Sequence, residues 1–307
     1  MFIEEFAQKL GKDSQEIREF LINAPDKYKL FTIPKRKHGY RLIAQPSREL
    51  KVYQRELENL IDFPVHHRAM AYCKGRSIKN NALCHIDNSY LLKLDFENFF
   101  NSITPEIFWA AWSKTWSLPC DEDRFYIEKL IFWRFQDVLI LSVGAPSSPL
   151  ISNFCMYHFD KDIEDICLRM NVIYTRYADD LTFSSNVKNI LFEVPKLIQE
   201  SLGRLFGNSI RINTGKTIFS SKAHNRHVTG ITLDNTDKIS LGRERKRYIK
   251  HKVHYYTLGL LDVNEINHLK GLISFSKFIE PNFIKSLEVK YTSVMITKLL
   301  EERDDQD

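Results

Sequence analysis

The spacing of apolar positions predicts that short helices and strands follow one another along most of the chain. Residues 1–24 place apolar side chains at helical spacing and predict two amphipathic helices, the second capped by Asp13 or Ser14. Two β-like runs come next and flank the polar turn from Lys35 to Gly39, which is typical of a hairpin. Leu50 to Ile61 then predicts a helix. The N-terminal region should therefore contain short helices and one hairpin.

The middle of the chain alternates strand and helix patterns. Tyr90 to Leu94 is a mostly apolar run of strand length. Ser148 is suited to cap a helix whose apolar face continues to about Met170. Val172 to Tyr177 and Leu181 to Ser184 follow it, flank a short break and predict a second hairpin. The hairpin indicates an antiparallel sheet.

Helical patterns dominate the remaining segments. Residues 102–142 hold four tryptophans among helical patterns, and core packing is their expected role. Residues 191–206 predict a helix and residues 227–240 a further hairpin. From Arg243 onward, helices continue to an acidic tail at residues 301–307, which we expect to be frayed.

Composition narrows the class of protein. With 307 residues and 43% hydrophobic content, the chain can bury a sizeable core and form about two domain-sized units. A net charge of +5 permits a polyanionic partner. Five cysteines without a Cys-x-x-Cys pair predict a reducing, cytoplasmic location with neither a disulfide framework nor a structural zinc site. No stretch is apolar enough to span a membrane, and the N-terminus does not read as a signal peptide.

Two adjacent carboxylates, Asp179 and Asp180, occupy the break in the second predicted hairpin, and this tip has no Lys or Arg of its own. Because side chains alternate along a strand, one should point into a site while the other supports it or reaches a second ion. Crowded carboxylates resist ionisation, and a divalent cation such as Mg²⁺ relieves that repulsion. The alternative interpretation is a solvated Asp-Asp turn.

A metal pair needs a carboxylate from elsewhere, and Asp95 is the candidate. It directly follows the strand predicted at Tyr90 to Leu94, and Phe96, Phe99 and Phe100 would wall the site. The alternative is a core strand that ends in a helix-capping aspartate.

Two loops are candidates for contact with a phosphate-bearing ligand. Gly144 and Pro146 allow a tight loop that can lay backbone amides against a base pair or nucleotide, although a well-capped core helix would use the same residues. The basic turn between Lys35 and Gly39 can fold over a triphosphate, or it can be a solvated surface hairpin.

The order of these motifs resembles the palm of a reverse transcriptase. A strand leads to Asp-x-x-x-Phe-Phe, then come Gly-x-Pro-x-Ser-Pro-x-x-Ser-Asn and Tyr-Ala-Asp-Asp. The bacterial retron enzymes are the most similar type, on the basis of the following stretches: Asn81, Ala82 and His85; Val228-Thr229-Gly230; and Arg211 to Lys216. The similarity covers roughly residues 30–240, and the ordered set is far more specific than any one motif.

The resemblance implies an α+β right-hand polymerase with fingers, a palm of antiparallel sheet plus helices, and a helical thumb. The expected divisions are N-terminal helices at 1–26, fingers at 27–90, palm at 91–225 with an inserted fingers segment at about 102–142, a primer-grip hairpin at 226–240 and thumb at 241–307.

The same resemblance assigns the catalytic chemistry. Asp95, Asp179 and Asp180 are the expected catalytic residues, and with the backbone carbonyl of Phe96 they would hold two Mg²⁺ ions. The expected nucleotide-binding residues are Arg41, Phe100, Pro146 and Lys216. Phe100 falls at the steric-gate position, where its ring would crowd a ribose 2′-OH. In one departure from many relatives, which carry Pro-Gln-Gly in this loop, Pro146 is followed by two serines.

Expected contacts with RNA or primer–template follow from the retron-type stretches and a basic helix: Asn81, His85, Val228, Thr229, Gly230, Arg243, Lys246 and Arg247. Asn81 and His85 would share a helix face, either as a structural element or as an RNA contact. Without the family pattern, they read as a helix cap and a core hydrogen bond, and the basic helix as a solvated face.

A retron enzyme implies specific partners. The resemblance implies that the protein binds its own structured noncoding RNA, primes from a guanosine 2′-OH and copies part of that RNA into a branched, RNA-linked single-stranded DNA from deoxynucleoside triphosphates. The RNA–DNA product would join an effector protein in anti-phage defence, with no membrane partner. The alternatives are a reverse transcriptase of the group II intron or diversity-generating type, and a non-catalytic RNA-binding scaffold.

Overall fold

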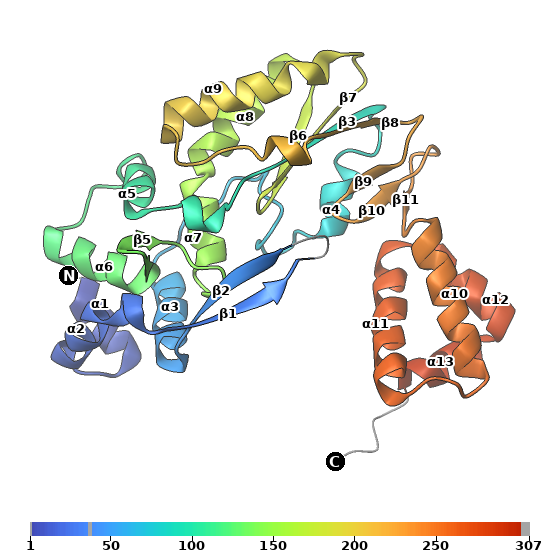
Figure 1. The fold of residues 1–307 in the computed structure, drawn as a ribbon, viewed down its shortest axis with the longest axis horizontal. Coiled ribbons are helices and arrows are strands. Elements are labelled where there is room, and N and C mark those ends of the chain that lie inside the picture. The colour runs from blue at the N-terminus through green and yellow to red at the C-terminus, as the bar shows by residue number, and fades with distance from the viewer. Residues whose placement is uncertain (1, 36–38, 302–307) are drawn as a thin grey trace. The chain divides into compact units, whose positions relative to one another are not determined.

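The computed structural model describes residues 2–35 and 39–301 (Figure 1). The chain divides into two compact units, each described by itself: Met1–Arg76 with Leu92–Phe219, and Ser77–Leu91 with Ser220–Asp307. The middle of the predicted basic turn and the predicted acidic tail beyond Glu301 lie outside the described residues. None of the helices in the described ranges has both the length and the apolar character needed to cross a membrane.

The first unit begins with the predicted helices α1 (Phe2–Leu10) and α2 (Ser14–Ile22). Asp13 caps α2, because its carboxylate accepts hydrogen bonds from two backbone amides of the first turn. Helix α3 (Arg48–Leu60) packs against α1, with the rings of Phe6 and Tyr53 meeting edge to face. This region contributes to the core of the first unit.

The predicted basic hairpin is present as β1 (Tyr28–Pro34) and β2 (Tyr40–Pro46), paired antiparallel over seven residues. A loop from much later in the chain lies against β2, since Ala44 donates its N–H to Val143 at 3.2 Å. Gly144 has φ +135°, and a Cβ there would lie 2.9 Å from the Ala44 carbonyl oxygen. Only glycine therefore permits this close approach of the two backbones.

The central sheet has the strand order β6-β7-β3-β8, formed by β3 (Tyr90–Asp95), β6 (Ile173–Tyr177), β7 (Asp180–Ser185) and β8 (Ile218–Ser221). Strands β6 and β7 form the predicted second hairpin, with Tyr177 opposite Asp180. The outer edge of β6 is covered by residues 68–70, which exchange backbone hydrogen bonds with Arg176.

The helix predicted from Ser148 to Met170 is in fact two helices, α7 (Ser148–Cys155) and α8 (Tyr157–Arg169). At the break, Met156 donates its N–H to both Ser152 and Phe154, and its side chain is fully buried. The apolar face continues through the break, so periodicity could not reveal it. The predicted cap is also wrong, because Ser147 and not Ser148 precedes the first turn and no side chain caps it.

Helices complete the first unit on either side of these elements. Helix α8 packs on β6, and α9 (Val194–Phe206) packs on α8. The predicted inserted segment contains α5 (Pro105–Ser113), α6 (Asp121–Ile131) and the short hairpin of β4 (Trp133–Phe135) and β5 (Val138–Ile140). The structure confirms the packing role of three of its tryptophans, which are at most 8% exposed: Trp109, Trp112 and Trp133.

The second unit combines two distant segments of chain. Residues 77–91, with helix α4 (Ile78–Leu83), pack with a three-stranded sheet of order β11-β10-β9. Its strands are β9 (Arg226–Val228), β10 (Ile231–Leu233) and β11 (Ile239–Ser240). Four helices follow: α10 (Arg243–Thr257), α11 (Val263–Ile279), α12 (Pro281–Tyr291) and α13 (Ser293–Glu301). One apolar cluster joins both segments, since Ala82 and Leu91 pack with residues between Val228 and Leu299.

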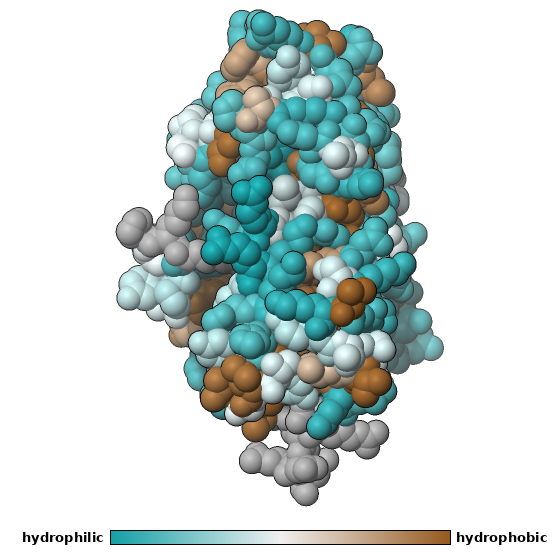
Figure 2. All heavy atoms as spheres, turned by 90° about the vertical axis from the view of Figure 1, so that its right-hand side faces the viewer, coloured by the Kyte–Doolittle hydropathy of each residue, from teal (hydrophilic) through white to brown (hydrophobic). Residues whose placement is uncertain are grey.

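The helices and antiparallel strands segregate as an α+β fold, as predicted. Figure 2 views the right-hand side of Figure 1 and shows a mainly hydrophilic face with scattered hydrophobic side chains. Isolated exposed apolar residues are ordinary on a protein surface, so this face is not an evident apolar docking surface.

Candidate active site

The three predicted carboxylates come together at one end of the central sheet. Asp95 is the last residue of β3, Asp180 is the first residue of the neighbouring β7, and Asp179 lies in the turn before it. The Phe96 N–H donates to the Asp179 carbonyl oxygen at 3.0 Å, so the end of β3 is tied directly to the hairpin turn. Asp95 and Asp179, which are 84 positions apart in the chain (179 − 95), are thereby placed side by side.

The turn itself has an unusual backbone. Ala178 has φ 57°, in the left-handed region that non-glycine residues rarely adopt. Because Tyr177 pairs with Asp180, only Ala178 and Asp179 form the loop of the hairpin. Two-residue hairpin loops need positive φ, and Ala178 meets that need without a glycine.

Mutual repulsion and burial oppose ionisation of the turn carboxylates. The pKa of Asp179 is raised by burial and by the charge of Asp95, against the effect of its backbone hydrogen bond. Burial among protein atoms and the charges of Asp179 and Asp95 raise the pKa of Asp180 to about 6, even though its side chain reaches solvent. Two nearby cations, Arg41 and Lys216, lower the pKa of Asp179 in part.

Lys216 is held against the third carboxylate. Its Nζ lies 2.7 Å from Oδ1 of Asp95, whose backbone carbonyl also accepts from the Asn213 N–H at 2.8 Å. Lys216 ends a short 3₁₀ turn, Thr214–Lys216, and its side chain is 58% exposed while that of Asp95 is 12% exposed. The lysine is therefore paired with Asp95 while more than half of its side chain stays exposed to solvent.

Contacts relate the other predicted nucleotide-binding residues to Tyr72 and to the strand that carries Arg41. Phe100 begins a 3₁₀ turn, Phe100–Ser102, and its ring centroid lies 6.5 Å from that of Tyr72. Tyr72 is exposed, has φ 61°, and feels the charges of both Asp179 and Arg41. Pro146 lies in the loop that is bonded to β2, the strand that carries Arg41. Sequence analysis missed Tyr72, which no motif marks.

Three residues of the second unit are corrected by the structure. Asn81, His85 and Val228 are 0% exposed, so their side chains are packed in the protein and are not presented to RNA. Asn81 lies in α4, whereas His85 follows the end of that helix, so they do not share a helix face as predicted. The structural interpretation of the Asn81 and His85 pair is therefore the one that the geometry favours.

The remaining predicted RNA-binding residues differ in their availability. Thr229 and Gly230 form the β9–β10 turn, both with positive φ, and the Thr229 hydroxyl donates to the Ile78 carbonyl at 3.3 Å. On α10, Arg243 and Arg247 are exposed. Lys246 instead forms an ion pair with Glu280 at 2.9 Å, which competes with any phosphate contact.

Comparison with known proteins now gives the family. Residues 33–233 match the family described as Reverse transcriptase (RNA-dependent DNA polymerase). The chain is 47% identical over 270 residues to the Retron Ec83 reverse transcriptase of Escherichia coli, covering 86% of each chain. It is 32% identical to the Retron Ec73 reverse transcriptase of Escherichia coli, covering 88% of this chain and 89% of that one. The chain belongs to the bacterial retron reverse transcriptases.

This retron reverse transcriptase is accordingly an RNA-directed DNA polymerase, and the comparisons favour that assignment over the intron, diversity-generating and scaffold alternatives. Among solved structures, apo telomerase from Candida tropicalis gives a TM-score of 0.48 at 12% identity, covering 87% of this chain and 58% of that one.

Divalent metal ions are general cofactors of reverse transcriptases, and the carboxylates of this retron reverse transcriptase fit one. They offer only oxygen ligands, which Mg²⁺ prefers, and no sulfur or imidazole ligand that would favour a softer metal. Burial and, after it, the charges of neighbouring carboxylates raise the pKa of Asp179 and of Asp180, and a divalent cation would offset both costs of ionisation. Lys216 and Arg41 supply too little charge to do so alone.

The effect of metal on the stability of the reverse transcriptase should depend on pH. A carboxyl whose folded pKa is raised gives a contribution to stability that is present below its unfolded pKa, about 3.9, and is lost as pH rises through its folded pKa. For Asp180 that loss is centred on about 6. We therefore expect Mg²⁺ to raise the thermal unfolding midpoint more at pH 8 than at pH 5.5, because the ion binds ionised carboxylates and removes their repulsion.

The matched control is Asp180→Asn, which should flatten the difference between the two pH values. Equal midpoint shifts at pH 8 and pH 5.5 for the unmodified enzyme would contradict the coupling of metal to these carboxylates.

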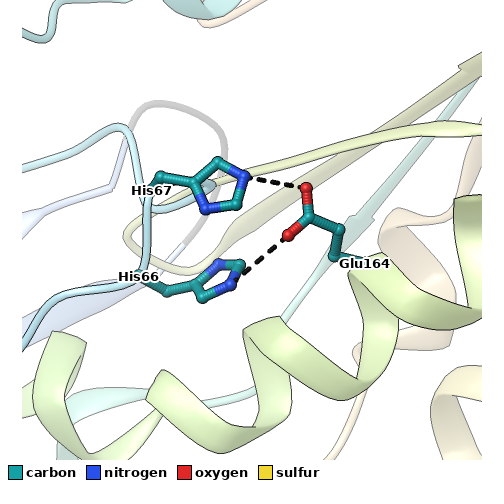
Figure 3. Close-up of side chains that lie close together, drawn as sticks. All are labelled: His66, His67 and Glu164. Carbon is teal, nitrogen blue, oxygen red and sulfur yellow. Dashed lines mark hydrogen bonds and ion pairs between the residues drawn. The ribbon is translucent and has the colours of Figure 1, made fainter.

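A second group with metal-ligand chemistry, His66, His67 and Glu164, lies away from the sheet end (Figure 3). Both imidazole Nε2 atoms point at Glu164, at 3.4 and 2.8 Å. Nδ1 of His66 faces the Arg68 N–H at 3.4 Å and so acts as acceptor, which leaves the proton on Nε2, where a metal would need a lone pair. Arg68 also bonds Glu164 at 2.6 Å. We interpret this group as an ion-paired cluster that connects residues 66–68 to α8.

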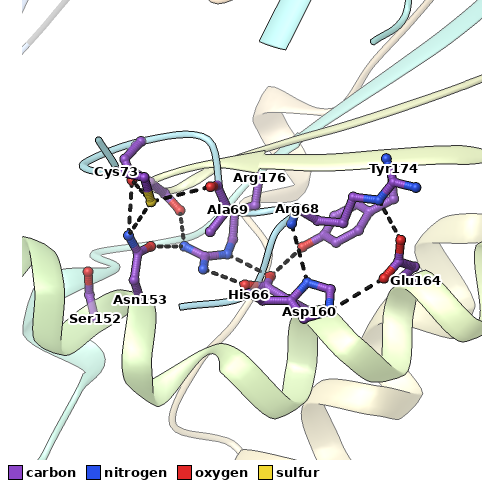
Figure 4. Close-up of polar contacts among 12 residues, drawn as sticks. His66, Arg68, Ala69, Cys73, Ser152, Asn153, Asp160, Glu164, Tyr174 and Arg176 are labelled. Carbon is purple, nitrogen blue, oxygen red and sulfur yellow. Dashed lines mark hydrogen bonds and ion pairs between the residues drawn. The ribbon is translucent and has the colours of Figure 1, made fainter. Parts of the chain in front are cut away.

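Next to the turn of Ala178 and Asp179 lies a buried polar network that sequence analysis did not find (Figure 4). Asp160 of α8 and Arg176 of β6 form an ion pair at 2.6 Å, and both side chains are 0% exposed. Burial opposes the charge of Arg176, but Asp160 outweighs it and raises the arginine pKa. No local pattern marks this pair, because one residue lies on a helix and the other on a strand, and charged residues by composition belong on a surface.

Proposed function

We propose that this reverse transcriptase copies part of its cognate structured noncoding RNA into single-stranded DNA that stays joined to the RNA, priming from a guanosine 2′-OH. The observation that carries the proposal is the 47% identity over most of the chain to a retron reverse transcriptase, joined with the convergence of Asp95, Asp179 and Asp180. The partners are the retron RNA, its RNA–DNA product and deoxynucleoside triphosphates, and an effector protein that acts with the product in anti-phage defence.

In the proposed mechanism, Asp95 and Asp179 would hold two Mg²⁺ ions with the help of Asp180 and the Phe96 carbonyl. When bound, the ions lower the pKa of the attacking hydroxyl and balance the charge of the leaving pyrophosphate. The hydroxyl oxygen forms a bond to the α-phosphorus as the bond to pyrophosphate breaks. Lys216, 2.7 Å from Asp95, can move onto the pyrophosphate and neutralise or protonate it.

Substrate positioning is assigned to the residues around the carboxylates. Arg41 of β2 is exposed and would bind the triphosphate, while the loop with Pro146 would contact the base pair. Phe100 would exclude a ribose 2′-OH. We propose the division into fingers, palm, primer grip and thumb at the boundaries predicted from the sequence, except that residues 77–91 pack with the C-terminal unit.

On the second unit, the exposed Arg243 and Arg247 of α10 are the proposed phosphate contacts. The Thr229–Gly230 turn is proposed to approach the primer end. Asn81, His85 and Val228 would support that turn from inside the unit, since Thr229 bonds the first residue of α4.

The experiment that tests the proposal is synthesis without an added DNA primer. Purified enzyme, the RNA that copurifies with it, Mg²⁺ and labelled deoxynucleotides should give DNA that remains attached to RNA after heat denaturation. An annealed RNA can hold the 2′-OH in line and so replace a bimolecular encounter, which favours such priming. Ribonuclease should trim the product to a short branched remnant.

The outcome that opposes the proposal is labelled DNA that separates fully on heating, or that forms only after a DNA oligonucleotide is added. The enzyme would then be a reverse transcriptase that extends ordinary primers.

A further inference from the structure

The buried network next to the turn of Ala178 and Asp179 is organised around one guanidinium group. Asp160 accepts from Nε of Arg176 at 2.8 Å and from Nη2 at 2.6 Å, so one edge of the guanidinium is held bidentately by this carboxylate. Tyr174 donates its hydroxyl to the same carboxylate at 2.7 Å. This part of the network fixes the arginine inside the first unit and makes no contact with the turn.

The third nitrogen of Arg176 points elsewhere. Nη1 donates to the carbonyl of Ala178 at 3.1 Å and to Oδ1 of Asn153 at 3.1 Å. Asn153 in turn donates from Nδ2 to the carbonyl of Ala71 at 2.9 Å. Figure 4 shows Asn153, on its helix, between the arginine and the segment that carries Ala69 and Cys73. One chain of hydrogen bonds therefore ends on two separate backbone carbonyls.

Both carbonyls belong to strained turns at the site. Ala178 has φ 57° and is followed by Asp179; Ala71 is followed by Tyr72, which has φ 61°. Left-handed backbone at non-glycine residues persists where its surroundings over-determine it, and such residues cluster at functional sites. Here the over-determining contacts come from Arg176 and Asn153, which are 0% exposed.

The two turns carry different parts of the site. The first presents a carboxylate to the proposed metal ions. The second presents the Tyr72 ring, whose centroid is 6.5 Å from that of the gate residue Phe100. Because Tyr72 also lies within the electrostatic reach of Arg41 and Asp179, its ring borders the space for the incoming nucleotide.

We propose that Arg176 and Asn153 are positioning residues that hold the Asp179 carboxylate and the Tyr72 ring in fixed relation, and that Tyr72 is a second aromatic wall of the nucleotide pocket beside Phe100. This inference rests on the proposed roles of Asp179 and Phe100. In this proposal, the hydrogen bond from Arg176 to the Ala178 carbonyl positions Asp179 for the metal ions, which we call the metal side of the site. The hydrogen bond from Asn153 to the Ala71 carbonyl positions Tyr72 near the sugar of the nucleotide, which we call the sugar side.

The test uses two variants with separate readouts. Arg176→Lys keeps a charge for Asp160 but lacks the planar fork needed to reach Ala178 as well. Mn²⁺ binding, followed by electron paramagnetic resonance in the complex of enzyme, RNA template, chain-terminated DNA primer and deoxynucleotide, should weaken by about tenfold, as expected for one lost charge-assisted hydrogen bond. Asn153→Ala keeps the ion pair and should increase the ratio of ribonucleotide to deoxynucleotide incorporation by about threefold or more.

Tyr174→Phe is the matched control. It removes a buried hydrogen bond to Asp160 and should lower the unfolding midpoint, but it touches neither turn and should leave Mn²⁺ affinity and the incorporation ratio unchanged. Tyr72→Ala should reproduce the change of ratio seen with Asn153→Ala without the loss of stability.

The inference is overturned if Arg176→Lys and Asn153→Ala behave as Tyr174→Phe does, with lower stability but unchanged Mn²⁺ affinity and unchanged ratio. If Arg176→Lys fails to fold, Asn153→Ala and Tyr72→Ala still test the sugar side. An unchanged ratio of ribonucleotide to deoxynucleotide incorporation in both variants overturns the proposed role of Asn153 and Tyr72. Asp179→Ala separates the two levels of the argument: if it leaves Mn²⁺ binding intact, the metal assignment itself is wrong.

Discussion

Asp179→Ala is expected to abolish DNA synthesis while RNA binding stays within a factor of about two. Asp179 lies in the turn beside Asp95, in the first unit, and the proposed RNA contacts on α10 lie in the second. Loss of the carboxylate should lower the rate of nucleotide addition by at least about 10³-fold, since stabilisation by a bound metal amounts to several kcal/mol and each 1.36 kcal/mol is tenfold.

Primer extension with Mg²⁺ measures the rate, and filter binding of labelled RNA measures the affinity. The matched control is Asp165→Ala, which removes an exposed carboxylate from α8 and should change neither. Comparable synthesis by Asp179→Ala and the unmodified enzyme would remove Asp179 from the metal site.

Phe100→Ala should admit ribonucleotides. The Phe100 ring is half-buried, packs on Phe99 at 5.4 Å between centroids and lies beside the Tyr72 ring at the proposed pocket. Without the ring, a 2′-OH no longer meets a steric barrier. Discrimination against ribonucleotides should fall by about 10–200-fold, the range that a hydrophobic pocket achieves by shape alone.

Relative incorporation of ribo- and deoxyribonucleotides on one template measures this effect. Phe125→Ala is the control, because Phe125 is 44% exposed on α6, outside the group of residues proposed for catalysis. An unchanged ratio in Phe100→Ala would reassign the gate, with Tyr72 as the next candidate.

Patterns within short segments predicted those features of the site that each lie within one segment. The β6–β7 hairpin follows from two β-rich runs with a break, and Asp95 follows from an apolar run of strand length. Their meeting could be expected only from the resemblance, because β3 and β7 are far apart in the chain. The carboxylate residues could therefore be identified from the sequence. The pairing of their strands could not, because it depends on both segments together.

Long-range polar burial escaped prediction for a physical reason. Arg176 and Asp160 are charged, so by composition each belongs on a surface, and only their pairing makes burial tolerable. His85 is fully buried, which agrees with the core hydrogen bond that its residue type and apolar neighbours allowed. The break at Met156 was hidden because both helices keep one apolar face across it.

The composition of the second unit has a consequence for synthesis of the enzyme. Ala82 and Leu91 leave the ribosome long before Val228, the next buried member of their apolar cluster. The 137 residues from Leu91 to Val228 (228 − 91) take roughly 7–27 s to add at about 5–20 residues per second. During that interval Ala82 and Leu91 lack the partners that bury them in this cluster. Nascent chains should therefore depend on chaperones at this stage, and the yield of folded enzyme should respond to translation speed across residues 92–227.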